Sequence, residues 1–146
     1  MKSTRILALL LLLATTTPAQ APIASDIAFT GTLTNGRFWS QCMYDEKLVW
    51  LLGYSDGIKS AAAVIGKAEP GDKLLRAILA LQPTDRLTHS EIVQGIDRFY
   101  IDTPENGSVP VTGALRYVES KAKGATQAEL DDLARSMRKA ATTIEK

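Results

Sequence analysis

Apolar residues recur at steps of three and four over most of this chain, and this spacing constrains its fold more than any other feature. Between Asp45 and Gly66 the apolar positions follow such steps, and the pattern returns in four later segments. The segments are 74–79, 92–99, 111–122 and 130–144. This spacing places apolar side chains on one face of an α-helix, and no segment alternates strongly enough to predict a strand. We therefore predict an all-α fold, a compact bundle of about five to six helices.

Turn-forming and capping residues mark the ends of these helices. Thr88 with Glu91, and Thr126 with Glu129, have the spacing of capping boxes, in which the two side chains bond the amides of the first turn. Pro110 suits the first position of a helix, and Gly124 suits a left-handed C-terminal cap. A short helical turn over 36–41 precedes the long helix. In the last helix we expect Asp131 to pair with Arg135 at i, i+4.

The first residues are typical of a secretory signal peptide. Lys2 and Arg5 precede an apolar stretch over 6–14, which is followed by Ala19-Gln20-Ala21. The stretch is shorter than the roughly 20 residues that a membrane-spanning helix needs. We prefer cleavage after Ala19 over cleavage after Ala21, which would leave Pro22 at the new N-terminus. The domain prediction is a signal peptide over 1–21, a flexible leader over 22–34 and a helical domain over 35–146.

The mature chain is expected in the periplasm or outside the cell. No later segment approaches transmembrane length, so we expect no membrane span after cleavage. Removal of Lys2 and Arg5 lowers Lys+Arg from 17 to 15 against 16 Asp+Glu, which changes the net charge from +1 to −1. A chain without a basic surface is not expected to bind nucleic acid.

Cys42 is the only cysteine, which excludes an intramolecular disulfide. We expect its thiol to be a small buried apolar group. One cysteine and one histidine, His89, do not make a zinc site of the usual kind, and we predict no metal and no cofactor.

One segment has the letters of a catalytic motif. Gly53-Tyr54-Ser55-Asp56-Gly57 matches the G-x-S-x-G nucleophile elbow, which needs a strand before the serine and a helix after it. Here the residues lie in the middle of a helical pattern. We predict no catalytic residue and no enzyme activity, and a small serine hydrolase using Ser55 is the alternative.

The turn from Asp102 to Pro110 is the candidate binding surface. Loops that a rigid scaffold positions often carry recognition, and this turn is rich in Asp, Glu, Asn and Pro. The candidate binding residues are Arg98, Tyr100, Asp102, Glu105 and Asn106. Asp97 and Arg98 are expected on the solvated side of their helix.

Three stretches, 35–42, 52–58 and 87–115, resemble the Rap/Tai family of type VI secretion immunity proteins. These are small exported helical proteins that bind and block cell-wall amidase effectors in the periplasm. The first stretch is similar to the family's opening Gly and Cys region, and the second to its G-Y-x-x-G helix. In the third, a Thr-capped helix leads to an aromatic residue, a proline turn and an Ala-Leu helix. Family members usually pair cysteines, whereas Cys42 has no partner, and the segment 67–86 is longer than expected.

The segments 98–100 and 103–110 resemble uncharacterised exported proteins of environmental bacteria more closely. The resemblance implies an exported, non-enzymatic protein-binding module with an envelope partner such as a cell-wall hydrolase. A structural role in the envelope, with a homodimer formed through the Gly53/Gly57 face, is a further alternative.

Overall fold

Six α-helices and one 3-10 helix follow a two-stranded hairpin in the part of the chain that the structure, a computed structural model, describes: residues 28–68, 73–83 and 85–144. The elements are β1 (Phe29–Thr30), β2 (Leu33–Thr34), α2 (Gly36–Trp39), α3 (Tyr44–Ala68), α4 (Lys73–Leu79), α5 (His89–Ile101), η1 (Pro104–Ser108), α6 (Val111–Ala122) and α7 (Gln127–Ile144). The predicted all-α class is confirmed. The predicted signal peptide over 1–21 lies outside the described residues.

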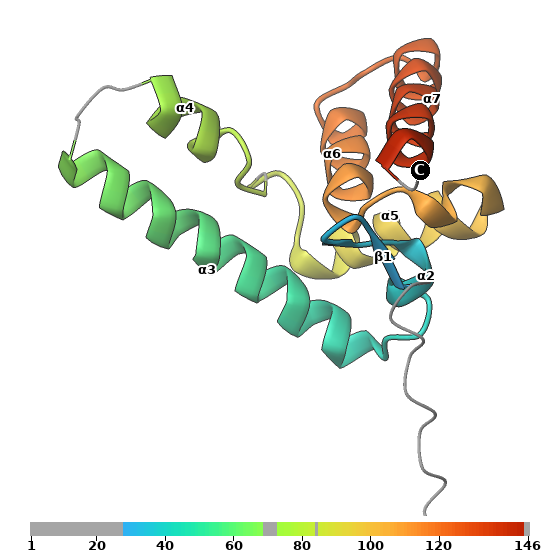
Figure 1. The fold of residues 1–146 in the computed structure, drawn as a ribbon, viewed down its shortest axis with the longest axis horizontal. Coiled ribbons are helices and arrows are strands. Elements are labelled where there is room, and N and C mark those ends of the chain that lie inside the picture. The colour runs from blue at the N-terminus through green and yellow to red at the C-terminus, as the bar shows by residue number, and fades with distance from the viewer. Residues whose placement is uncertain (1–27, 69–72, 84, 145–146) are drawn as a thin grey trace, which may run out of the picture.

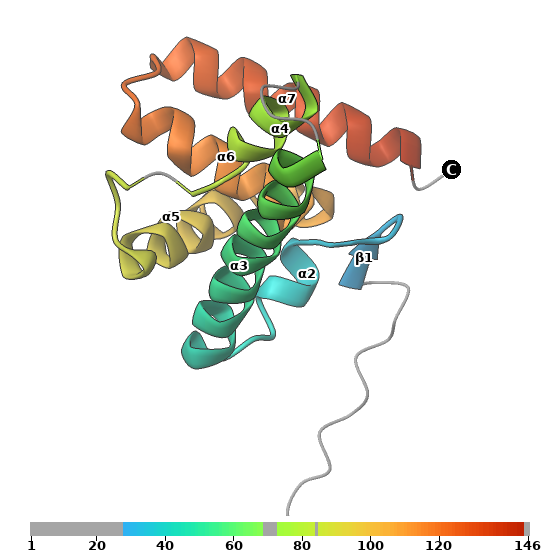
Figure 2. The ribbon, with the colours of Figure 1, turned by 90° about the vertical axis from the view of Figure 1, so that its left-hand side faces the viewer.

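The helices form a core and an arm, and the arm consists of α4 and the C-terminal half of α3. α6 and α7 lie side by side and cross above α5, whereas α3 runs along one side and α4 folds back over its C-terminal half (Figures 1 and 2). The buried core lies where α5 and α6 meet the N-terminal half of α3, α2 and the segment before α6. Its fully buried members include Trp39, Leu51, Ile92, Val93, Ile96, Val109 and Val111. A cleft of about 690 Å³ separates the arm from α6 and α7.

The two predicted capping boxes and the left-handed cap at Gly124 are confirmed, whereas the turn predicted over 36–41 ends at Trp39. The Thr88 amide donates to the Glu91 carboxylate over 2.8 Å, and the Glu91 amide donates back to the Thr88 hydroxyl over 3.2 Å. The capping box of Thr126 and Glu129 forms in the same way, with distances of 2.7 and 3.4 Å. Gly124 has a φ of 92°, the left-handed conformation expected of this cap. Pro110 is the N-cap of α6 and not its first residue.

The described part of the segment 22–34, which was expected as a flexible leader, forms a short hairpin against the helices. Ala28 and Thr30 are buried, and β1 and β2 pair as a short antiparallel hairpin. The Thr30 hydroxyl donates to the Ser108 carbonyl, and the Asn35 side chain donates to the Thr30 oxygen over 3.2 Å. Strands of two residues are too short to show an alternating pattern, and these long-range hydrogen bonds hold them in place.

Asp97 was expected in solvent, and the structure corrects this. One oxygen of its carboxylate accepts from the Trp39 indole N–H over 2.7 Å and pairs with the Lys47 ammonium at 2.8 Å. The Lys47 side chain is only 14% exposed and lies 5.5 Å from the centre of the Trp39 ring. We call Trp39, Lys47 and Asp97 the Asp97 cluster. It joins α2, α3 and α5 at the edge of the core.

The charged surface of α7 differs from its prediction in one pair. Arg135 pairs with Asp132, at 3.0 Å, and not with Asp131. The Asp131 carboxylate accepts instead from the side-chain amide of Gln127 over 2.7 Å. Residues three and four apart are both neighbours on a helix surface, so spacing does not decide between the two partners.

Cys42 is half-buried and not fully buried as expected. Its thiol lies 3.5 Å from the Phe38 carbonyl, which it contacts as a weak donor. Partial burial raises the pKa of the Cys42 thiol, and the nearby Glu46 carboxylate raises it further. This thiol is therefore less ionised at neutral pH than an ordinary cysteine.

The segment Tyr44–Gly66 of α3 is long and apolar enough to cross a membrane by length and composition alone. This corrects the expectation that no segment after the leader approaches such a length. The helix differs from an ordinary core helix, because only 17% of its most apolar window is buried. Much of the apolar surface of α3 is therefore exposed.

Replacing Asp97 with alanine is expected to lower the free energy of unfolding by about 2 kcal/mol, because a half-buried ammonium and an indole N–H lose their shared acceptor. Asp132→Ala is the matched control. It breaks a pair whose side chains are 72% and 73% exposed, which we expect to cost about 0.5 kcal/mol or less. Chemical denaturation followed by circular dichroism measures both values, and equal losses would contradict the role of the cluster.

The capping box of Thr88 and Glu91 predicts that the stability of the protein depends on pH. Hydrogen bonds from the backbone amide and the hydroxyl of Thr88 lower the pKa of the Glu91 carboxyl. A carboxyl with a lower pKa in the folded state contributes stability above its unfolded pKa and loses that contribution as the pH falls through its folded pKa. In an NMR titration we expect Thr88→Ala to raise the pKa of Glu91, and Thr88→Ser to leave it low. An unchanged pKa in Thr88→Ala would show that the hydroxyl makes no contribution.

Candidate functional site

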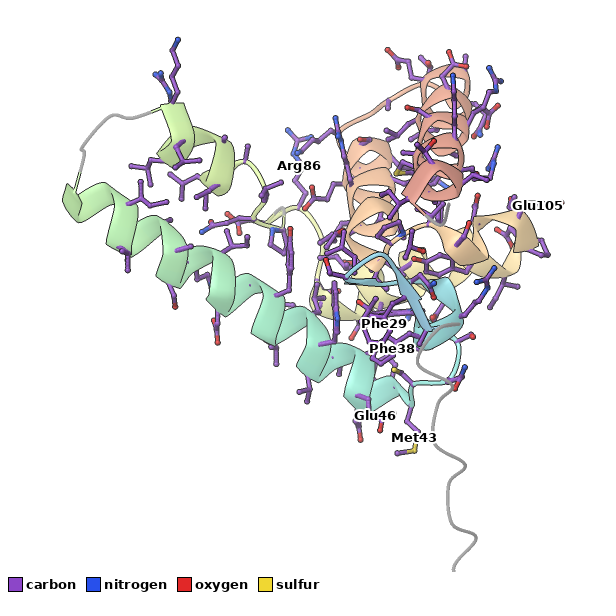
Figure 3. All side chains as sticks on the ribbon, viewed as in Figure 1. Phe29, Phe38, Met43, Glu46, Arg86 and Glu105 are labelled. Carbon is purple, nitrogen blue, oxygen red and sulfur yellow. The ribbon has the colours of Figure 1, made fainter. Side chains whose placement is uncertain are left out.

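The predicted binding turn is the 3-10 helix η1 and the residues beside it. η1 lies between α5 and α6 and contacts α2 and α7. Arg98, Asp102 and Glu105 are exposed, whereas Tyr100 and Asn106 are buried. Figure 3 shows Glu105 at the outer side of this turn, directed away from the other helices. Three of the five predicted residues therefore lie on the surface, and two support it from inside.

Tyr100 fixes the chain after η1 and does not face a partner. Its hydroxyl donates to the Val109 carbonyl over 3.0 Å, and burial raises the pKa of the phenol far above its ordinary value. The ring packs against Gly36, where an added Cβ atom would lie 2.4 Å from the ring carbons. Only glycine lets α2 approach the aromatic ring this closely.

Asn106 connects α5, η1 and α7 through one side chain. Its amide nitrogen donates to the Phe99 carbonyl, and its amide oxygen accepts from the Arg138 guanidinium, both over 2.7 Å. The side chain is 2% exposed, and both its donor and its acceptor are used. Asn106 is therefore a structural centre of the turn. Its burial also makes the Asn-Gly-Ser sequence at 106–108 a poor glycosylation acceptor.

Above this centre lies a groove of about 750 Å³ between α5, α6 and α7. We call it the α5–α7 groove. Arg98 and Asp102 lie on its α5 side, Lys121 on its α6 side and Arg135 and Arg138 on its α7 side. Phe99 and Tyr117 meet in the groove, with ring centroids 4.9 Å apart. The exposed turn and the polar groove are thus parts of one surface.

The charges of the groove are mixed in sign. Its cationic side chains are Arg98, Lys121, Arg135 and Arg138, and its anionic side chains are Glu91, Asp102 and Asp131. Arg135 is already paired with Asp132 outside the groove. Arg98 and Lys121 form no ion pair with any residue that the structure describes. These two cations are available to a ligand without breaking an existing bond.

Among the described residues, no cysteine or histidine lines the groove, so it has neither a cysteine nucleophile nor a histidine base. His89 is exposed at the start of α5, and Cys42 lies beside α2, so neither lines the groove. Ser55 is 8% exposed in the middle of the continuous helix α3, where no strand-to-helix elbow is formed. Over residues 28–68, 73–83 and 85–144, no group of three or more His, Cys, Asp or Glu residues is placed to hold a metal ion. Non-enzymatic function stays a prediction.

No sequence motif indicated that α6 and α7 contribute residues to the groove. Tyr117 and Lys121 lie one turn apart on α6, and Arg138 comes from α7. Each looked like an ordinary position on a surface helix. The one available signal was the periodicity of α6, in which Tyr117 and Lys121 fall beside the buried face and not opposite to it.

No protein-family model matches this chain, and no curated protein or solved structure matches it either.

We expect Asn106→Ala to lower the free energy of unfolding by about 1–3 kcal/mol, because the Phe99 carbonyl and the Arg138 guanidinium lose their partner in a buried site. Glu105→Ala, at the exposed neighbouring position, is the matched control and should change it by about 0.5 kcal/mol or less. Urea denaturation measures both. A similar small effect for the two variants would show that Asn106 does not hold the turn.

Proposed function

We propose that this protein is a non-enzymatic binding module that recognises another protein through the α5–α7 groove. The observation that carries the proposal is the composition of the groove, in which arginine and lysine side chains line the same surface as the half-buried Tyr117, which packs on the buried Phe99. Tyrosine and arginine are the residues that most often dominate the energy of protein interfaces. They combine a large contact area with directional hydrogen bonds.

The mixed charge of the groove favours a polypeptide over a polyanion. A nucleic acid is bound by a surface of one sign, because each phosphate needs a cation. Here Asp102 and Asp131 line the same groove as Arg98 and Lys121. A protein surface that carries both signs complements such a pattern, and complementary charges provide specificity as well as a faster encounter.

The groove is prepared for binding before a partner arrives. Asn106 holds η1 against α5 and orients Arg138 from α7, so the groove's inner end is fixed by hydrogen bonds. Less conformational entropy is lost on association when side chains are already ordered. The exposed side chains Arg98, Asp102 and Glu105 then extend the contact along the outer edge.

The Rap/Tai resemblance supplies the class of partner. An immunity-like protein of this kind binds a cell-wall hydrolase in the periplasm and masks it. The signal-like segment over 1–21 supports export to that compartment. We accordingly propose a periplasmic or secreted location and an envelope protein as the partner.

The test is affinity capture of the tagged protein's partners from the envelope fraction of its own organism, quantified by mass spectrometry. Arg98→Glu with Lys121→Glu should reduce recovery of the partner by about tenfold or more, because two unpaired cations at the groove become anions. Arg116→Glu with Lys123→Glu is the matched control. These residues carry the same charge change on and beside α6 but line the cleft toward the arm.

Recovery of one stoichiometric protein that the control variant retains and the groove variant loses supports the proposal. Equal recovery by both variants would contradict the groove as the binding surface. Recovery of no protein by the unaltered chain would contradict a protein partner in the envelope.

A further inference from the structure

The outer side of α3 carries a stripe of exposed residues at heptad spacing. Their steps of three, four, three and four residues place them along one side of the helix. We call them the α3 stripe: Val49, Leu52, Asp56, Lys59 and Ala63. Val49 is 68% and Leu52 is 47% exposed, which is high for large apolar side chains. Helices in a coiled coil pack through a stripe of this spacing, and three of the five residues here, Val49, Leu52 and Ala63, are the apolar residues that such a stripe requires.

No described segment of the chain covers this side of α3. The neighbouring Gly53 and Gly57 have no atom within 4 Å of the position that a Cβ would occupy. Asp56 and Lys59 form no ion pair with any residue in the described ranges. Figure 3 shows Glu46 near the N-terminal end of α3, directed away from α4 and the core.

We infer that the α3 stripe packs antiparallel against the α3 stripe of a second copy of this chain. In an antiparallel pair the two stripes meet in alternating layers. The register that brings Asp56 opposite Lys59 of the second copy also brings Leu52 opposite Ala63. A two-fold axis repeats each of these contacts, because residue i meets j wherever j meets i.

The charges select this orientation. A parallel pair would place Asp56 against Asp56 and Lys59 against Lys59, which is repulsive at both layers. The antiparallel pair forms two Asp56–Lys59 ion pairs at the centre of the seam, with the larger Leu52 facing the smaller Ala63 on each side. A polar residue within a seam specifies register at a cost in stability, and opposite charges across a helix pair set its orientation.

The same charges argue against a lipid environment for α3. The helix has the length and mean hydropathy of a membrane span, but Asp56 and Lys59 lie near its middle. Charged side chains at the centre of a bilayer are strongly disfavoured unless they face protein or water. A second protein copy satisfies both residues, whereas acyl chains satisfy neither.

This inference goes beyond the proposed recognition function and uses a different surface. The α5–α7 groove contains no α3 residue, so both sites can be occupied together. The proposed dimer contact also differs from the Gly53/Gly57 face expected from the sequence. The apolar and charged side chains lie on the stripe beside these glycines and not on the glycines themselves.

The test is the mass of the protein in solution, measured by sedimentation equilibrium over a range of concentrations. We expect a dimer for the unaltered chain. Asp56→Lys and Lys59→Asp each place like charges opposite one another, and each should weaken dimerisation by about tenfold or more. An equimolar mixture of the two single variants should dimerise again, because the opposite charges then meet across the seam. Lys139→Asp, an exposed change of the same size on α7, is the control and should stay dimeric.

A monomer for the unaltered chain at all concentrations would overturn the inference. Single variants that remain dimeric, or a mixture that remains monomeric, would also overturn the antiparallel register. Flotation of the unaltered chain with phosphatidylglycerol vesicles that is lost in Leu52→Glu would assign the stripe to a membrane surface instead. Circular dichroism of each variant verifies that the helices persist. The outcome of the partner-capture experiment with the groove variant does not bear on dimerisation, because the groove contains no stripe residue.

Discussion

The side-chain amide of Asn106 is the interaction on which the geometry of the candidate site depends. It connects the carbonyl of Phe99 at the end of α5 to the guanidinium of Arg138 in the middle of α7. Because the amide is buried, water does not replace either bond at low cost. The turn that bears Asp102 and Glu105, and the end of the groove beneath it, are therefore held by one residue.

A second constraint explains why the two halves of α3 behave so differently. The N-terminal half is tied to the core by Leu51 and by the Asp97 cluster, whereas the C-terminal half contacts α4 across the cleft from α6 and α7. The Tyr54 hydroxyl, which donates to the Leu81 carbonyl over 3.1 Å, is one of the few bonds between α3 and the chain after α4. Because this helix is anchored at one end and packed on one side, it exposes large apolar side chains, Val49, Leu52 and Val64, between its charged ones. Such a face is usually covered by another protein surface.

Local patterns predicted the helices and their ends well, because both depend on residues close together in sequence. The capping box of Thr88 and Glu91 needs only a spacing of three, and the left-handed cap at Gly124 needs only one glycine. The long-range polar contacts could not be predicted in this way. Lys47 and Asp97 are 50 residues apart, and no periodicity indicates that α3 and α5 bring them together.

The candidate site shows the same division. Sequence composition pointed to the turn over 102–110, and Arg98 and Asp102 line the groove beside it. It did not separate surface residues from supporting ones, because Asn and Tyr are common in both roles. Only the fold reveals that the Tyr100 hydroxyl donates to the Val109 carbonyl and that the Asn106 side-chain nitrogen donates to the Phe99 carbonyl.

The distribution of paired and unpaired charges links the two surfaces. Charges that stabilise the fold already have partners, as Asp97 and Lys47 do at 2.8 Å. The groove and the α3 stripe differ from these, since Arg98 and Lys121 in one and Asp56 and Lys59 in the other have no ion-pair partner among the described residues. Unpaired surface charges contribute little to folding, but charges that complement a partner confer specificity on association. The two surfaces therefore share one feature, unpaired charges, on which both the proposed binding of another protein and the proposed self-association depend.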